Sequence, residues 1–195
     1  RELTTWPGQL DFSAELSKAA AAKPDAIFAF YPGGAGIQFV TQYVQKGLKG
    51  QIPLYTAFTI DDLSLPRLKD LAVGIPGAQQ WVNDLPNAAN KKYVADFTKA
   101  AGFRPNFMSV GGYDGMHLIY EALKKTGGKA DGDSLIAAMK GMKWESPRGP
   151  ISIDPETRDI VQNIYIRKVE KVDGELYNVE FATFEAVKDL GKTKK

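Results

Sequence analysis

The sequence contains no cysteine, which excludes disulfides, thiolate nucleophiles and cysteine-based metal sites. Cysteine-free chains are found both in the periplasm and in the cytosol, so the absence leaves the compartment open. Histidine is almost as scarce, since His117 is the only one in 195 residues. A Ser-His-Asp triad or a histidine metal site would depend on that single side chain, and its spacing favours a surface position. We predict no catalytic residue, no metal site and no cofactor.

Neither sign of charge is in excess, because 25 Lys and Arg stand against 23 Asp and Glu. Nucleic-acid binding needs a basic stripe with interleaved aromatics, and the only basic cluster is the tail Lys192, Lys194 and Lys195, which is typical of a solvated chain end. We therefore predict no nucleic-acid partner. No apolar run approaches the length of a membrane span. The chain begins at Arg1 without a charged and then apolar leader, from which we expect a fragment of a longer protein.

The segment from residue 26 to residue 47 predicts a strand, a glycine-rich loop and a helix. The apolar run 26–30 favours a central parallel strand covered on both faces, and Ile37, Val40 and Val44 repeat at helical spacing before Gly47. The connecting loop is Tyr31-Pro32-Gly33-Gly34. In open α/β sheets ligands bind beyond the carboxyl ends of the strands, and N–H groups at a helix start favour an anion. An ordinary connection is the alternative.

Other elements alternate in the same way and predict an α/β fold. We expect a strand at 3–6, a helix from Asp11, a strand at 52–56 and a helix capped by Asp61 and Asp62. The Gly- and Pro-rich stretch 73–86 is typical of a connection between lobes. Helices then follow at 89–100, at 106–125 and from the cap Asp133-Ser134 to Met139, and strands at 151–154, 164–169 and 177–184, the last two joined by a turn at Asp173-Gly174.

Enzyme motifs are missing, whereas residues suited to ligand recognition are present. Phe39 occupies the position of the last glycine of a dinucleotide fingerprint, and Gly191-Lys192-Thr193 lacks the earlier glycine of a P-loop. Tyr31, Phe58 and Tyr113 fall where aromatic rings would line a cleft, because a tyrosine stacks on a ligand and donates its hydroxyl to a carboxylate. The alternative for Tyr113 is the core stripe of its helix, with Met116, Tyr120 and Leu123.

Together these segments resemble a known family. The runs DFSAELSKAAAAKPDAIFAFYPGGAGIQFVTQYVQKGL, IPLYTAFTIDD, VGIPGAQQW, GGYDGMHLIYEALKKTGG and RGPISIDPETRD follow one another as in the C-terminal part of the leucine/isoleucine/valine-type periplasmic binding proteins, the type I solute-binding components of ABC importers. The resemblance implies two Rossmann-like lobes with mostly parallel sheets, truncated at the N-terminal half. It also implies a lobe-two part at 1–77, a lobe-one part at 78–168, and a hinge return with final lobe-two strands at 169–195.

The resemblance implies a periplasmic, non-enzymatic protein whose lobes close on a small solute and whose closed form is recognised by an inner-membrane permease. Residue by residue, Tyr31, Pro32 and Gly33 match a ligand-packing loop, and Tyr113 matches a cleft aromatic. Thr56, with Ala57 and Phe58, stands where amino-acid binders of the family place an acid on the ligand's ammonium group. The residues that grip the solute's carboxylate are expected in the missing N-terminal half.

The threonine at position 56 indicates the class of solute. A buried ammonium group without a carboxylate partner is costly, so we expect an aromatic or hydrophobic carboxylate, such as a benzoate, a phenylpropenoate or a 2-oxo acid. The alternative is that Asp61 or Asp62 binds the ammonium group of the solute, which would make the protein a branched-chain amino-acid binder. A second alternative is a ligand-sensing regulatory domain of the same fold, and an α/β enzyme using His117 is a weaker third.

Overall fold

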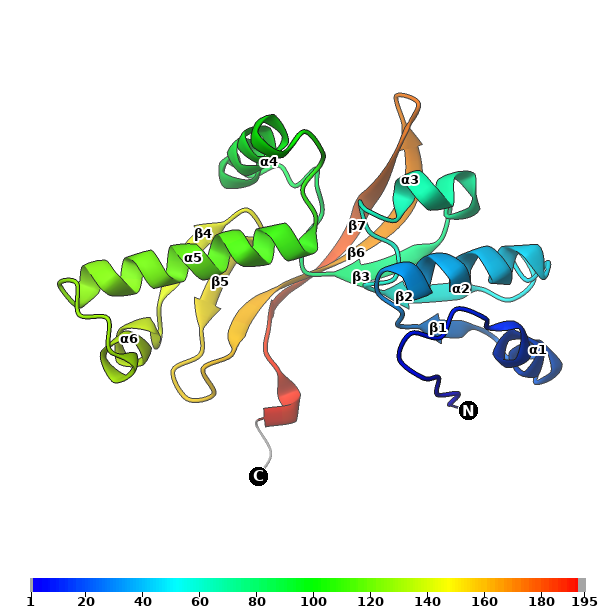
Figure 1. Ribbon diagram of the computed structural model, residues 1–195, viewed down its shortest axis with the longest axis horizontal. Helices are drawn as coiled ribbons and strands as arrows, with labels where there is room; N and C mark the ends of the chain where they lie inside the picture. The colour runs from blue at the N-terminus through cyan, green and yellow to red at the C-terminus, as the bar shows by residue number, and fades with distance from the viewer. Residues whose placement is uncertain (1, 193–195) are drawn as a thin grey trace. The chain divides into compact units, whose positions relative to one another are not determined.

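The computed structural model describes residues 2–192, which form two compact units (Figure 1). Unit 1 holds the described residues up to Gln79 together with Ile166–Phe181. Unit 2 holds Gln80–Tyr165 and the described residues from Ala182 onward. The two longest strands, β6 (Ile160–Val172) and β7 (Glu175–Val187), therefore contribute residues to both units. The predicted tail residues Lys194 and Lys195 lie outside the described residues.

Unit 1 is built on a parallel sheet. Strand β1 (Ile27–Ala29) pairs with β2 (Leu54–Ala57), and β2 pairs with β3 (Pro76–Gln79), all in parallel. The register puts Ala29 opposite Thr56 and Thr56 opposite Gly77, so the carboxyl ends of the three strands meet at one edge. β6 lies next to β3. The predicted α/β fold of this family is confirmed, and its carboxyl edge is where a ligand is expected.

Short helices connect these strands. They are α1 (Ser13–Ala21), α2 (Gly34–Gln45), α3 (Leu65–Leu68) and a 3₁₀ turn (Lys69–Leu71). Their apolar faces and the strands bury one core, which includes Phe12, Leu16, Phe39, Val40, Leu54, Leu68 and Val169. The N-cap of α3 is Ser64 without a side-chain cap, so the cap predicted at Asp61 and Asp62 is wrong; Asp61 instead closes the preceding turn by accepting the Ser64 N–H at 2.8 Å.

Three other predictions for unit 1 are wrong. β1 is an edge strand rather than a central one, and the side chains of Phe28 and Phe30 are 70% and 57% exposed. An apolar run indicates that both faces of a strand are buried in the complete fold, but it does not show whether the described residues provide the elements that bury them. Residues 76–79 are strand β3 rather than part of an irregular connection, and residues 3–6 form no strand.

Unit 2 combines helices with antiparallel strands. Its helices are α4 (Ala88–Ala101), α5 (Phe107–Lys125), α6 (Gly132–Met139) and the terminal 3₁₀ turn Leu190–Lys192. β4 (Lys143–Ser146) pairs antiparallel with β5 (Gly149–Ile153), and β5 pairs antiparallel with β6. α5 runs alongside β4 and β5 (Figure 1), and the core holds Trp81, Val82, Leu85, Tyr93, Val110 and Tyr165.

Local signals fix the helix ends of unit 2. Asn106 caps α5 by accepting the N–H groups of Met108 and Ser109, and Gly102 ends α4 in the left-handed region at φ 78°. The cap of α6 is Asp131, which accepts the Ser134 N–H at 2.9 Å, so the predicted cap at 133 is two residues late. Asp133 lies in the first turn instead, where a carboxylate also suits the helix dipole.

The apolar stripe predicted on α5 exists but is not buried by the described residues. Tyr113, Met116 and Tyr120 are 50%, 45% and 55% exposed. The turn between β6 and β7 matches its prediction, because Asp173 and Gly174 both adopt positive φ, at 51° and 85°.

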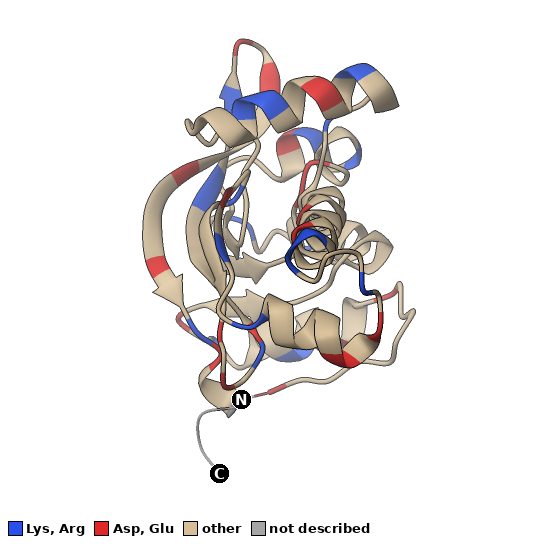
Figure 2. Ribbon diagram, turned by 90° about the vertical axis from the view of Figure 1, so that its left-hand side faces the viewer, with Lys and Arg blue, Asp and Glu red and all other residues tan. Residues whose placement is uncertain are grey.

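Charges of both signs are scattered over residues 2–192 (Figure 2), whereas α2 and the strands β1, β2 and β3 carry none. Within that range no helix combines the length and the apolarity that crossing a membrane requires.

Candidate functional site

The loop between β1 and α2 packs tightly against the loop that follows β2. The Tyr31 N–H donates to Thr59 Oγ1 at 3.0 Å, and that hydroxyl lies 3.3 Å from the Ala29 carbonyl and 3.1 Å from the Ala57 carbonyl. A Cβ on Gly36 would lie 2.0 Å from the Tyr31 carbonyl oxygen and 2.9 Å from the Thr59 carbonyl oxygen. Only glycine therefore lets the first turn of α2 approach both loops.

The predicted residues Tyr31, Pro32 and Gly33 all lie in this loop. Pro32 and Gly33 are exposed, and Gly33 ends the loop at φ 68° without any side-chain cap on α2. The ring of Tyr31 is half-buried and packs on Phe12 and Phe39, with ring centroids 4.9 Å away in each case. Its hydroxyl accepts a bond from Thr5 Oγ1 at 3.4 Å. Ligand contact by the Tyr31 ring stays a prediction.

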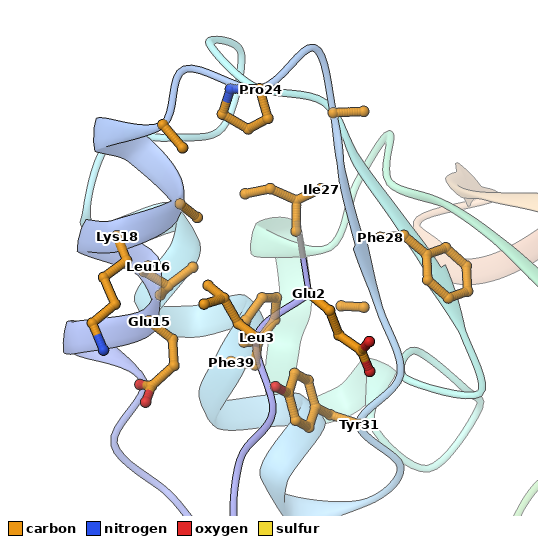
Figure 3. Close-up of a pocket in the computed structure, with 14 residues that line it drawn as sticks. Glu2, Leu3, Glu15, Leu16, Lys18, Pro24, Ile27, Phe28, Tyr31 and Phe39 are labelled. Atoms are coloured by element: carbon orange, nitrogen blue, oxygen red, sulfur yellow. The ribbon is translucent and has the colours of Figure 1, made fainter.

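A pocket of about 480 Å³ lies between α1 and β1 in unit 1 (Figure 3). Leu16 and Ile27 point into it, and Tyr31 lies at one end. Glu2, Glu15 and Lys18 are the charged residues of its lining. The pocket follows the outer edge of β1 rather than the carboxyl ends of the strands. Its walls thus include a strand that pairs on one side only.

The stretch Thr56-Ala57-Phe58, which is predicted to contact the solute and lacks the acidic residue of amino-acid binders, lies at the carboxyl end of β2. Thr56 is buried, and its hydroxyl donates to the Pro76 carbonyl at 3.2 Å. Phe58 is half-buried with a left-handed backbone at φ 55°, a conformation that non-glycine residues adopt at a cost and mostly at functional sites. The stretch contributes a hydroxyl and an aromatic ring, and it contributes no carboxylate.

Phe30 is a candidate site residue that the sequence did not reveal. Its ring lies 5.9 Å from that of Phe58 in an edge-to-face arrangement, and its side chain is 57% exposed. The apolar run of β1 pointed to burial, so only the position of Phe30 at the end of the strand was a usable signal. The two rings together form an aromatic surface at the carboxyl edge of unit 1.

Asp61 and Asp62 follow this aromatic surface, and both interact electrostatically with a buried cation. Both carboxylates are buried, with 7% and 8% of their surface exposed. The guanidinium of Arg167 on β6 is affected by Asp62 and, more weakly, by Asp61, both of which favour its charged form. A carboxylate already balanced by an arginine is a poor partner for a ligand's ammonium group.

Tyr113 belongs to unit 2, and its ring packs on that of Tyr93 at 5.0 Å. The Tyr93 hydroxyl donates to Ser109 Oγ at 2.7 Å, and burial raises the pKa of Tyr93. Tyr113 thus packs on Tyr93 with one part of its ring, while half of its surface stays exposed.

A buried polar network fixes the neighbouring turn of α5. Asp114 Oδ2 accepts Arg148 Nε at 2.7 Å and Ser146 Oγ at 2.8 Å, and Asp114 Oδ1 accepts Trp144 Nε1 at 3.3 Å. Arg148 Nη1 also donates to Gln162 Oε1 at 2.8 Å. The network ties α5 to β4, to the turn between β4 and β5 and to β6, and it was not predicted because Asp114 lies 30 or more residues from its partners.

His117 packs its ring on Trp144, with centroids 5.4 Å apart. Among residues 2–192, no group of three or more His, Asp or Glu residues is arranged to hold a metal ion. The aromatic surface of unit 1 has the flat, apolar character that suits a ring-shaped solute.

Comparison with known proteins gives consistent matches. The family model described as periplasmic binding protein matches residues 2–175. The Leu/Ile/Val-binding protein homolog 6 of Brucella melitensis biotype 1 is 42% identical over 187 residues, which are 93% of this chain and 48% of that protein.

Two solved structures are similar over almost the whole chain. A solute-binding protein of an ABC transporter from Rhodopseudomonas palustris BisB5, in complex with 3,4-dihydroxybenzoic acid, is 62% identical with a TM-score of 0.88, covering 94% of this chain and 51% of its own. A second, from Rhodopseudomonas palustris HaA2 in complex with p-hydroxybenzoic acid, is 40% identical with a TM-score of 0.91, covering 96% and 52%.

The chain spans about half the length of these relatives. The resemblance to solute-binding proteins and the prediction of a non-enzymatic family are confirmed by these matches. The chain belongs to the periplasmic binding protein family.

Proposed function

We propose that this chain is part of the solute-binding component of an ABC importer and that its solute is a small aromatic carboxylate. In unit 1 the aromatic surface, Thr56 and the backbone amides near Gly33 contact the solute, and in unit 2 Tyr113 does so. The whole protein works in the periplasm with an inner-membrane permease and has no nucleic-acid partner.

One observation carries the choice of solute. The Thr56-Ala57-Phe58 stretch offers a ring and no acid where an amino-acid binder would need an acid, and Asp61 and Asp62 already interact with the charged Arg167. The 62% identical relative in complex with 3,4-dihydroxybenzoic acid supports the same class of solute. The Leu/Ile/Val-binding name of the 42% identical relatives favours the alternative, a branched-chain amino acid.

Calorimetry of the complete protein with 3,4-dihydroxybenzoate, 4-hydroxybenzoate and L-leucine tests the proposal. We expect saturable binding of at least one benzoate and no binding of leucine at the same concentrations, because a buried ammonium group would lack a carboxylate partner. Leucine bound more tightly than both benzoates would overturn the choice.

A regulatory domain of the same fold is the second candidate. It predicts a DNA-binding or signalling module in the same polypeptide, whereas the importer component predicts a signal peptide. Sequencing the coding region upstream of Arg1 distinguishes the two.

A further inference from the structure

Arg167 is the most unusual buried side chain of unit 1. It lies on β6, which is the neighbour of β3. Just before β3, the Gly74 N–H donates to the Val169 carbonyl at 2.8 Å and the Val169 N–H donates to the Ile75 carbonyl at 3.3 Å. Only 1% of its surface is exposed. Its Nε would lie 3.9 Å from a Cβ placed on Gly77, an ordinary van der Waals distance, so the guanidinium lies close to β3 at this glycine.

Keeping this guanidinium buried is costly, and its contacts offset only part of the cost. Nη2 donates to the Ile60 carbonyl, whereas Nε and Nη1 have no hydrogen-bond partner among the described residues. Burial lowers the pKa of Arg167 to about 10, opposed by Asp62 and Asp61. The guanidinium therefore stays charged at neutral pH. An apolar side chain of similar volume would avoid the desolvation cost, so the arginine needs a specific reason.

The Ile60 carbonyl belongs to the loop that follows Phe58, and other contacts hold that loop at its two ends. At one end Thr59 Oγ1 bonds to the loop after β1. At the other end the Asp61 N–H donates to Ser64 Oγ at 2.8 Å and the Asp61 carboxylate accepts the Ser64 N–H. Arg167 is the anchor that reaches the middle of the loop from the sheet.

We infer that Arg167 is a positioning residue that holds the Phe58–Asp62 loop, and with it the aromatic surface of the solute site, in its binding conformation. It acts through its bond to the Ile60 carbonyl and through its charge, which compensates for Asp61 and Asp62 inside unit 1. The expected effect of Arg167 on solute affinity rests on the proposed function. Its role in holding the loop does not depend on which solute is bound.

Hydrogen exchange of the solute-free complete protein tests the positioning role directly. In Arg167→Met we expect amides 57–64 to exchange about tenfold faster or more, because a hydrogen bond from a charged donor is lost. Amides of α2 and of unit 2 should keep their wild-type exchange rates. Arg167→Lys keeps the charge and one donor, and it should restore most of the protection.

Arg148→Met is the matched control, since it removes the buried arginine of unit 2 and should loosen β4 and β5 while leaving amides 57–64 protected. Affinity for 3,4-dihydroxybenzoate is measured alongside, and Arg167→Met should weaken it about tenfold or more at a temperature where the variant is fully folded. Uniform acceleration throughout unit 1, or unchanged exchange at 57–64 in a folded variant, would refute the positioning role. If Arg167→Met does not fold, wild-type-like exchange of amides 57–64 in the Arg167→Gln variant refutes it equally. Failure of the wild type to bind any benzoate counts against the proposed function alone.

Discussion

Asp154 shows how a largely buried carboxylate organises a turn. It accepts the N–H groups of Glu156 at 2.9 Å and Thr157 at 3.1 Å, and Lys188 Nζ donates to it at 3.0 Å. The Thr157 bond first, then Lys188 and Glu156, hold the pKa of Asp154 down at about 2. All three contacts favour the ionised form.

The lowered pKa predicts how stability depends on pH. Because the folded pKa lies below the unfolded value of 3.8, the contribution of Asp154 is complete above pH 4 and is lost as the pH falls toward 2. Wild type should melt at a higher temperature than Asp154→Asn at pH 6, and the two should converge near pH 2. Melting curves measured by circular dichroism between pH 2 and pH 6 check this, and a constant gap over that range would contradict it.

At the scale of elements, the start of α2 depends on one glycine. Gly36 is buried where a Cβ would meet the Tyr31 and Thr59 carbonyl oxygens, whereas a Cβ on Gly34 in the same turn would meet no atom within 4 Å. The two positions therefore offer a matched pair of substitutions.

Gly36→Ala should destabilise unit 1 by about 2 kcal/mol or more, since the backbone itself must move. Gly34→Ala should be neutral or stabilising by up to about 1 kcal/mol, because alanine is the better helix former and meets no obstacle. Urea denaturation followed by tryptophan fluorescence and circular dichroism measures both. Equal effects of the two substitutions would show that the loop after β1 adapts to a side chain.

The sequence was most informative about elements whose signals are local. α4, α5, α2 and the Asp173-Gly174 turn follow from periodicity, caps and positive φ. β3 was missed because its four residues include Pro76 and Gly77. Site contacts that join distant residues, such as Arg167 with Ile60, have no local signal and needed the coordinates. The predicted positions of Tyr31, Thr56 and Tyr113 as solute contacts remain predictions.

At the scale of the whole molecule, both units expose apolar surface within residues 2–192. In unit 1 this is the unpaired side of β1 with Phe28, and in unit 2 it is the α5 stripe with Tyr113, Met116 and Tyr120. Unpaired strand edges and apolar patches of this kind bind other chains. The relatives that the chain matches are about twice as long as the chain.

The chain on its own should therefore associate with copies of itself. Sedimentation at micromolar concentration should give a mass above the 21.4 kDa of one chain, and the double variant Phe28→Lys/Tyr120→Lys should shift it toward the monomer. Leu63→Lys, at a side chain that is 50% exposed outside both surfaces, is the control and should leave the mass unchanged. A wild-type monomer at every concentration would contradict this prediction.

The turn at the tip of β6 and β7 offers a practical consequence. Asp173 and Gly174 are exposed, belong to no predicted solute contact, and stand in a chain without cysteine. A cysteine introduced here would be the unique attachment point for a dye or a surface. Because Asp173 has a positive φ, the neighbouring exposed Lys171 is the less strained position for the substitution, as Lys171→Cys. Immobilised through this handle, the protein would keep its aromatic surface free for optical detection of benzoates in solution.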